Sequence, residues 1–175
     1  MKTLALLILI WGITIHHISI DTSAMHLTGK SSGETPEHLR QQMIDLINEV
    51  RSESRACGEM QFSPAPPLEW NPVLEEAARY HSSQMATQNF FSHRGPDSSH
   101  VGIRVQMMGY NWQYVGENIY AGIDTVTEAV YGWLDSTGHC KTIMNPDYTE
   151  IGAACVYSNA SQYENYWTQV FAAPM

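Results

Sequence analysis

The feature that most constrains the fold is a pair of apolar stretches near the C-terminus, Glu150–Tyr157 and Tyr166–Ala172, separated by the polar turn SNASQ. Short stretches rich in β-branched and aromatic residues on either side of a polar turn are typical of paired strands. We therefore expect an antiparallel hairpin. A third strand is predicted at Val115–Tyr120, within the stretch YVGENIYAG.

Four helices are predicted from start signals, which are a capping residue or a proline in the first turn. The first runs from Thr35 to about Cys57 and Gly58, and the second starts at Asn71 and Pro72 and has an apolar stripe that contains His81. The third runs from Asp97 or Ser98 to Met108, and the fourth starts at the capping box at Thr125. Helices and strands alternate without βαβ regularity, which favours an α+β domain in which helices cover a small antiparallel sheet.

The N-terminus has the pattern of a secretory signal peptide. Lys2 precedes an apolar run from Leu4 to Ile15, and Thr22 and Ala24 occupy the −3 and −1 positions of a cleavage site. The run is shorter than the ~20 residues that a membrane-spanning helix needs. We expect a signal peptide at residues 1–24, a flexible leader at 25–34 and one domain at 35–173. An uncleaved membrane anchor is the alternative.

The chain is acidic, with a formal net charge of −9 at pH 7. A negative surface repels phosphate groups, so nucleic acid and anionic membranes are poor partners. No integral membrane segment is expected in the mature chain.

The sequence has three cysteines, and export to an oxidising compartment favours their pairing. Cys140 and Cys155 are the predicted disulfide because they lie close in sequence at the two ends of a segment that contains a turn. Closing such a loop contributes ~3 kcal/mol in the chain-entropy account. Cys57 is then a free buried thiol or an intermolecular link.

Two histidines and one carboxylate are the candidates for chemistry, since no phosphate loop, GxSxG, HExxH or CxxC motif is present. Glu117 lies in a predicted strand, and an enclosed carboxylate needs a metal, a cation or a hydrogen-bond donor beside it. His93 follows NFFS at a loop tip, and His139 follows STG. On three different elements, these side chains could converge on a divalent metal, with zinc as the first candidate. Dispersed loop or capping histidines are the alternative.

Other polar and aromatic residues have structural interpretations. His81 is expected to be a core histidine. Ser136 is a candidate nucleophile beside His139, but a serine near a helix end is typical of a cap. Asn159, Ala160 and Ser161 form a glycosylation sequon for a eukaryotic secretory route. Several aromatic residues indicate either ordinary packing, which we favour, or an exposed groove for an apolar or glycan ligand. They are Tyr110, Trp112, Tyr114, Tyr131, Trp133, Tyr166 and Trp167.

Five motifs occur in an order typical of a known family: FFSH, VGENIYAG, a tryptophan-containing helix that leads to STGHCKTIMNP, YTEIGAACVY and YWTQVFA. In these motifs the chain resembles the CAP superfamily, which comprises the cysteine-rich secretory proteins, antigen 5 and the plant pathogenesis-related 1 proteins. It is most similar to the bacterial SCP-like branch of that superfamily. The resemblance covers about Thr35 to Ala173.

The resemblance implies a secreted three-layer α-β-α sandwich with a central cleft that holds two histidines and two acids. In some members this tetrad binds a divalent metal such as zinc. His93, Glu117 and His139 match three of its positions, so Glu117 is expected to face the two histidines. The fourth acid, three residues after the helix tryptophan, is Ser136 here, and the adjacent Asp135 is expected to point about 100° away on a helix. Losing one acid should weaken metal affinity.

Three functions follow from this resemblance. The first is a secreted, non-enzymatic binding module, extracellular or periplasmic, whose cleft takes a divalent metal weakly and whose partner is a protein, a glycan or a lipid. The second is a metal-dependent hydrolase in which the metal lowers the pKa of a bound water to ~7. The third is a sterol or lipid carrier. Because members of one fold differ in activity, the fold does not choose among them.

Overall fold

A computed structural model describes residues 36–175, so the predicted signal peptide, the leader and the Thr35 cap lie outside the described residues. The helices are α1 (Pro36–Arg51), α2 (Pro72–Gln88), α3 (Val101–Met107), α4 (Val126–Leu134) and α5 (Thr137–Met144). The strands are β1 (Arg55–Cys57), β2 (Met60–Phe62), β3 (Glu69–Trp70), β4 (Trp112–Ala121), β5 (Glu150–Tyr157) and β6 (Asn165–Pro174).

The main sheet has the strand order β3-β5-β6-β4. The predicted hairpin is confirmed, because β5 and β6 pair antiparallel with Cys155 opposite Trp167. The strand predicted around Glu117 is β4, which pairs antiparallel with β6 and forms one edge of the sheet. The sheet is not wholly antiparallel, since the two-residue strand β3 pairs parallel with β5.

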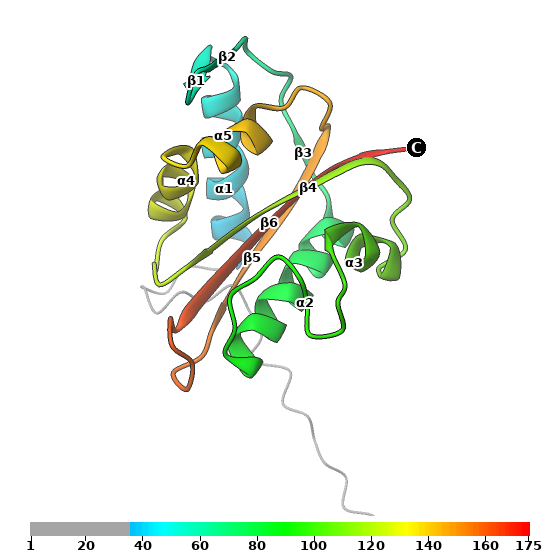
Figure 1. Ribbon diagram of the computed structural model, residues 1–175. Coiled ribbons are helices and arrows are strands. Elements are labelled where there is room, and N and C mark those ends of the chain that lie inside the picture. The colour runs from blue at the N-terminus through cyan, green and yellow to red at the C-terminus, as the bar shows by residue number, and fades with distance from the viewer. Residues whose placement is uncertain (1–35) are drawn as a thin grey trace, which may run out of the picture.

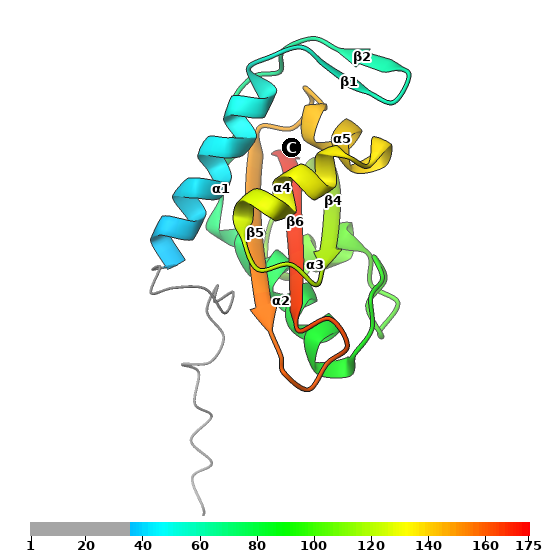
Figure 2. The ribbon, with the colours of Figure 1, turned by 90° about the vertical axis from the view of Figure 1, so that its left-hand side faces the viewer.

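Helices cover both faces of this sheet, which confirms the predicted α-β-α sandwich. Figure 1 shows α2 and α3 on one side of the sheet and α1, α4 and α5 on the other. In Figure 2 the elements α1, β5, β6 and β4 follow one another from left to right, so β4 lies at the far edge from α1. Gly152 on β5 permits the close contact with α2, because a Cβ there would collide with the α2 backbone at Leu74 and Glu75.

Local capping explains why two predicted helix starts are confirmed. The Asn71 side chain accepts hydrogen bonds from the backbone N–H groups of Val73 and Leu74 at the start of α2. At the start of α4, the Thr125 hydroxyl accepts from the backbone N–H of Glu128. These side chains satisfy amide groups that the first helical turn otherwise leaves unpaired.

Two other helical predictions are wrong in extent. The first helix ends at Arg51 instead of near Cys57, because the following residues turn into the β1–β2 hairpin, where Gly58 has a φ of 63°. Helix α3 starts at Val101, later than predicted. Helix α5 was not predicted as a helix.

The predicted disulfide between Cys140 and Cys155 is wrong. Cys57 pairs with Cys140 across 83 residues of sequence, and this bond joins the β1–β2 hairpin to α5. Cys155 is a free buried thiol, and burial raises its pKa. Proximity in sequence did not predict the pair because Cys155 lies in a central strand of the sheet, whereas Cys140 lies in a helix beside the hairpin.

Candidate binding cleft

Glu117 lies in the middle of the edge strand β4, and its side chain is 3 % exposed. Side chains alternate between the two faces of a strand. Asn118 donates to the backbone carbonyl of His139 on α5, so Glu117 must face the opposite layer, which contains α2 and α3. The expectation that Glu117 is enclosed is confirmed, and its partners determine what the site can do.

Arg104 of α3 is the cation that compensates Glu117. Its guanidinium is 1 % exposed and donates from Nη2 to Glu117 Oε2 at 2.5 Å. It also donates to the backbone carbonyls of Ser99 at 2.9 Å and His93 at 3.3 Å. The sequence analysis missed this residue. The available signal was a single arginine in the otherwise uncharged helix VGIRVQM, on the side that carries the buried Val105.

His93 is bound to the other oxygen of the same carboxylate. Its Nδ1 lies 2.8 Å from Glu117 Oε1, and its side chain is 56 % exposed. A carboxylate only accepts hydrogen bonds, so the Nδ1–H of His93 donates and the rest of the ring faces outward. Because Arg104 also binds the His93 carbonyl, the arginine holds both members of the pair in place.

His139 approaches from the opposite layer, on α5. Burial and the nearby His93 both lower its pKa, which places the two imidazoles within electrostatic reach of each other. Its Nδ1 is buried without a hydrogen-bond partner among residues 36–175. No hydrogen bond joins His139 to Glu117 in this part of the chain. The structure therefore pairs Glu117 with His93 and sets His139 beside them.

His81 is buried behind this group, as predicted for a core histidine. Its Nε2 lies 2.9 Å from the Ser92 carbonyl, so Nε2–H donates to that oxygen. Burial lowers its pKa, and the charges of Glu117 and Arg104 also act on the ring.

Ser136 and Asp135 do not add a fourth acid. Ser136 is the N-terminal cap residue of α5, and its side chain makes no capping hydrogen bond. Asp135 ends α4 and is exposed.

These residues do not fit a metal ion. Both oxygens of Glu117 are already bound, one by His93 and the other by the Arg104 guanidinium. Within the described range, no three His, Cys, Asp or Glu side chains are grouped closely enough to hold a metal. The Arg104 guanidinium already supplies the positive charge that compensates the Glu117 carboxylate.

An aromatic hollow adjoins the two histidines. Its volume is about 290 Å³, and it is lined by Phe91, Ile119, Tyr120, Ala121, His139 and Tyr163. The rings of Phe91 and Tyr163 meet edge to face with centroids 5.9 Å apart. We call the His93–Glu117–His139 group and this hollow together the cleft.

The aromatic residues singled out in the sequence serve mainly packing. Trp133, Tyr166 and Trp167 are fully buried, whereas Tyr114 and Tyr131 are exposed. None of these five lines the hollow, whose rings come instead from the loops after α2 and before β6 and from β4.

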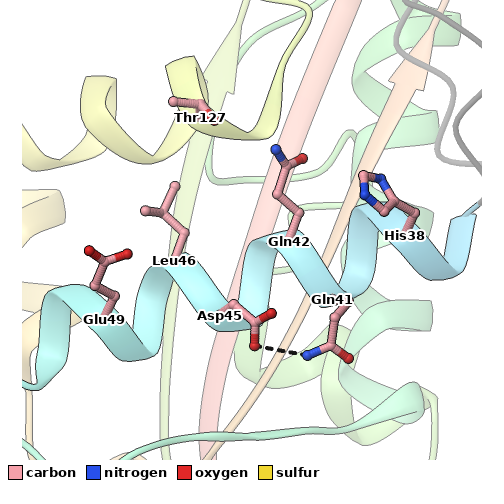
Figure 3. Close-up of a pocket in the computed structure, with 7 residues that line it drawn as sticks. All are labelled: His38, Gln41, Gln42, Asp45, Leu46, Glu49 and Thr127. Carbon is pink, nitrogen blue, oxygen red and sulfur yellow. Dashed lines mark hydrogen bonds between the residues drawn. The ribbon is translucent and has the colours of Figure 1, made fainter.

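A second hollow of about 370 Å³ lies on α1, and Figure 3 shows its lining. The lining residues are His38, Gln41, Gln42, Asp45, Leu46, Glu49 and Thr127. All but Leu46 are polar, and Gln41 donates to Asp45 within the same helix. This polar surface offers little apolar contact, so the cleft is the stronger candidate for a functional site.

No helix within residues 36–175 is long and apolar enough to cross a membrane.

Known proteins share this arrangement of elements. The chain is 34 % identical over 113 residues to the uncharacterized protein YkwD of Bacillus subtilis. This aligned region covers 65 % of this chain and 42 % of YkwD. An extracellular protein of Bacillus anthracis that contains an SCP domain is 31 % identical, with a TM-score of 0.63 over 81 % of this chain and 45 % of that one. The chain thus spans less than half the length of these two relatives.

A more distant structure shows the same fold. Venom allergen-like protein 4 of Schistosoma mansoni is 16 % identical, with a TM-score of 0.56 over 78 % of this chain and 88 % of that one. The model of the cysteine-rich secretory protein family, called CAP, matches residues 44–171. With most of its length matched, this chain belongs to the CAP family of cysteine-rich secretory proteins.

Proposed function

We propose that this protein is a secreted binding module, extracellular or periplasmic, that recognises its ligand in the cleft without a metal ion. The N-terminal signal pattern supports secretion, and the similar protein of Bacillus anthracis is described as extracellular. The single observation that carries the proposal is the state of Glu117, whose two carboxylate oxygens are bound by His93 and Arg104.

This arrangement favours recognition over metal-dependent hydrolysis. A hydrolytic metal site needs several free ligand atoms and an open position for water. Here the carboxylate is held by a buried guanidinium, and the exposed parts of the cleft are an imidazole and an aromatic hollow. Apolar linings with a few oriented polar groups are typical of ligand sites. The apolar part of a ligand would enter the hollow, with a polar group beside the histidines.

Isothermal titration of zinc into the metal-stripped domain tests the absence of a metal site. We expect no binding at micromolar concentration. A micromolar affinity that disappears in the His93→Ala, His139→Ala double variant would overturn this part of the proposal.

Fluorescence of the uncharged apolar dye N-phenyl-1-naphthylamine tests the hollow. Binding should weaken about tenfold in Tyr163→Ala, because the dye loses an aromatic wall. The matched control is Met60→Ala, which removes an exposed apolar side chain from the β1–β2 hairpin instead. Equal effects of the two variants would argue against the hollow as a binding site.

A further inference from the structure

The floor of the cleft is an unpaired strand edge. In the order β3-β5-β6-β4, strand β4 pairs with β6 on one side and with no described strand on the other. Figure 2 shows β4 at the edge of the sheet, with α5 near its upper part. His139 reaches this edge from α5, and His93 reaches it from the loop after α2. A free edge exposes backbone donors and acceptors that can pair with another chain.

Hydrogen bonds at the strand end show which backbone groups point outward. Gly122 N donates to Asn165 O at 3.0 Å, just beyond the pair Ala121–Tyr166. On the other side of β6, Thr149 N donates to Ala172 O, so the even-numbered residues of β6 bond to β5 and the odd-numbered ones bond to β4. In an antiparallel pair, bonded and non-bonded positions alternate along the strand.

The N–H and C=O groups that point away from β6 therefore belong to alternate residues of β4. These residues are Val115, Glu117, Ile119 and Ala121. Two of them, Ile119 and Ala121, also line the aromatic hollow. Ile119 is buried, with 4 % exposure, so Ala121 is the outward-facing backbone unit that is open to a ligand beside the hollow. A ligand that bonds to this edge has a place for one large apolar side chain.

The end of the edge beyond the hollow is acidic. Asp124 follows β4 and accepts a hydrogen bond from Asn165, and Glu164 is exposed next to Tyr163. Neither carboxylate takes part in an ion pair with a residue of the described chain. Tyr163 itself approaches Gly122, so this acidic end lies beside the hollow. A positively charged side chain would be complementary to it, and the net charge of −9 would attract a basic ligand from a distance.

We propose that the cleft binds an extended basic peptide segment, which adds to β4 as a further strand. One large apolar side chain of the peptide enters the aromatic hollow, and a lysine or arginine a few residues away faces Asp124 and Glu164. This inference rests on the proposed function, since it specifies the ligand class for the same cleft. Strand addition of this kind obtains affinity from main-chain hydrogen bonds and specificity from pockets for alternate side chains.

A peptide fits these features better than a lipid does. The outward groups of β4 recur at every second residue, a spacing of ~7 Å, and a peptide backbone repeats its donors and acceptors at the same interval. A lipid chain would leave these backbone groups without partners. The hollow, at about 290 Å³, lies at the small end of ligand pockets, which suits one side chain.

The test uses the synthetic peptide acetyl-Lys-Thr-Thr-Phe-Thr-Thr-Lys-amide and the complete domain. Titration calorimetry should show saturable binding, and replacing phenylalanine by alanine or both lysines by glutamate should weaken it at least about tenfold. Two backbone-methylated peptides give the sharper result. Methylation of alternate amides in one register should abolish binding, while methylation in the other register should leave it nearly unchanged, because only every second amide faces the edge.

A substitution in the strand gives a matched test on the protein. Ala121→Pro removes an outward N–H but no hydrogen bond to β6, and proline is tolerated at a strand edge. It should weaken peptide binding about tenfold while leaving the unfolding midpoint close to that of the wild type. The unfolding midpoint is the control, because a variant that loses peptide binding only through unfolding would also lose stability. If Ala121→Pro unfolds the domain, the methylated peptides still test whether the ligand binds along the edge of β4.

Two results with the peptides would overturn the inference. One is the absence of peptide binding, and the other is equal loss in the two methylated registers. The proposed function can be judged separately. It would be supported by dye binding that depends on Tyr163 and by the absence of zinc binding, even if the peptide does not bind. Saturable uptake of a labelled fatty acid that the peptide does not displace would assign the cleft to lipids and reject the peptide.

Discussion

Two arginines are buried to nearly the same degree, at 0 % exposure for Arg51 and 1 % for Arg104, but their acceptors differ. Arg104 donates to the Glu117 carboxylate beneath the cleft as well as to carbonyls. In the described part of the chain, the guanidinium of Arg51 donates only to backbone carbonyls, and these belong to Pro66, Ile143, Asn145 and Tyr148.

The acceptors determine what each arginine does. Arg51 joins the end of α1 to the end of α5 and to the segment before β5, so it fixes the layer that carries His139. Among residues 36–175 no carboxylate pairs with Arg51, and burial lowers its pKa to about 10. Arg104 forms a charge pair next to the exposed ring of His93. The first arginine holds the scaffold, and the second sets the electrostatics of the cleft.

Arg51→Met should have the largest effect on stability. It leaves up to four carbonyl oxygens without donors. Each hydrogen bond to a charged donor contributes roughly 1.5–3 kcal/mol, and the four contributions are not fully additive. We expect a loss of about 4 to 5 kcal/mol in the free energy of unfolding, measured with urea. Because the acceptors are uncharged, the loss should be the same at pH 7 and pH 5. A loss below 1 kcal/mol would show that water replaces the guanidinium.

Removing the Cys57–Cys140 disulfide should have the next largest effect. The bond spans 83 residues, and the chain-entropy account gives about 4.5 kcal/mol for a loop of that size. The Cys57→Ser, Cys140→Ser variant should therefore unfold at lower urea concentration. Cys155→Ala is the matched control, since that buried thiol forms no disulfide. If the control and the double variant lose equal stability, the disulfide contributes little beyond cysteine packing.

Arg104→Met should cost about 3 kcal/mol at pH 7, since it leaves an enclosed carboxylate without its cation. In contrast to Arg51→Met, this loss should depend on the charge of Glu117. Adding Glu117→Gln to Arg104→Met should restore much of the stability, because the carboxylate charge is then absent. Urea unfolding of Arg104→Met and of the double variant measures the difference. A double variant that is no more stable than Arg104→Met would place Arg104 in the same class as Arg51.

Local sequence signals predicted most of the fold. The cap at Asn71 and the capping box at Thr125 mark real helix starts, and the apolar stretches are the strands β5 and β6. Each signal acts over a few residues and needs no tertiary information. Helix α5 was missed because TGHCKTIM has a weak apolar stripe and no side-chain cap, so its packing against β1 and the disulfide help to hold it.

The site was less predictable because its partners come from distant segments. The family motifs indicated His93, Glu117 and His139, yet Arg104 lies in a short helix where an arginine is ordinarily solvated. Which cation meets the carboxylate depends on how α3 packs beside β4. The disulfide failed for the same reason, since 83 residues separate Cys57 from Cys140.

The smallest predicted effect concerns the pH dependence of the cleft side. Burial lowers the pKa of His81 below its usual value, so the folded protein keeps this ring neutral where the unfolded chain, with a histidine pKa of ~6.5, begins to bind a proton. Stability should be fully present above pH 6.5 and should fall below it. The slope is at most about 1.4 kcal/mol per pH unit for one histidine.

The variant His81→Gln separates this contribution from other groups. Its amide can still donate to the Ser92 carbonyl but takes up no proton, so urea unfolding between pH 5 and pH 8 should show a shallower fall than in the wild type. The remaining slope should contain the contribution of His139, because burial also lowers the pKa of that residue. His100→Gln, at an exposed position, is the control and should follow the wild type. Parallel curves for His81→Gln and the wild type would mean that acid sensitivity arises elsewhere, and the contrast between a pH-sensitive cleft and a pH-insensitive scaffold around Arg51 would then rest on His139.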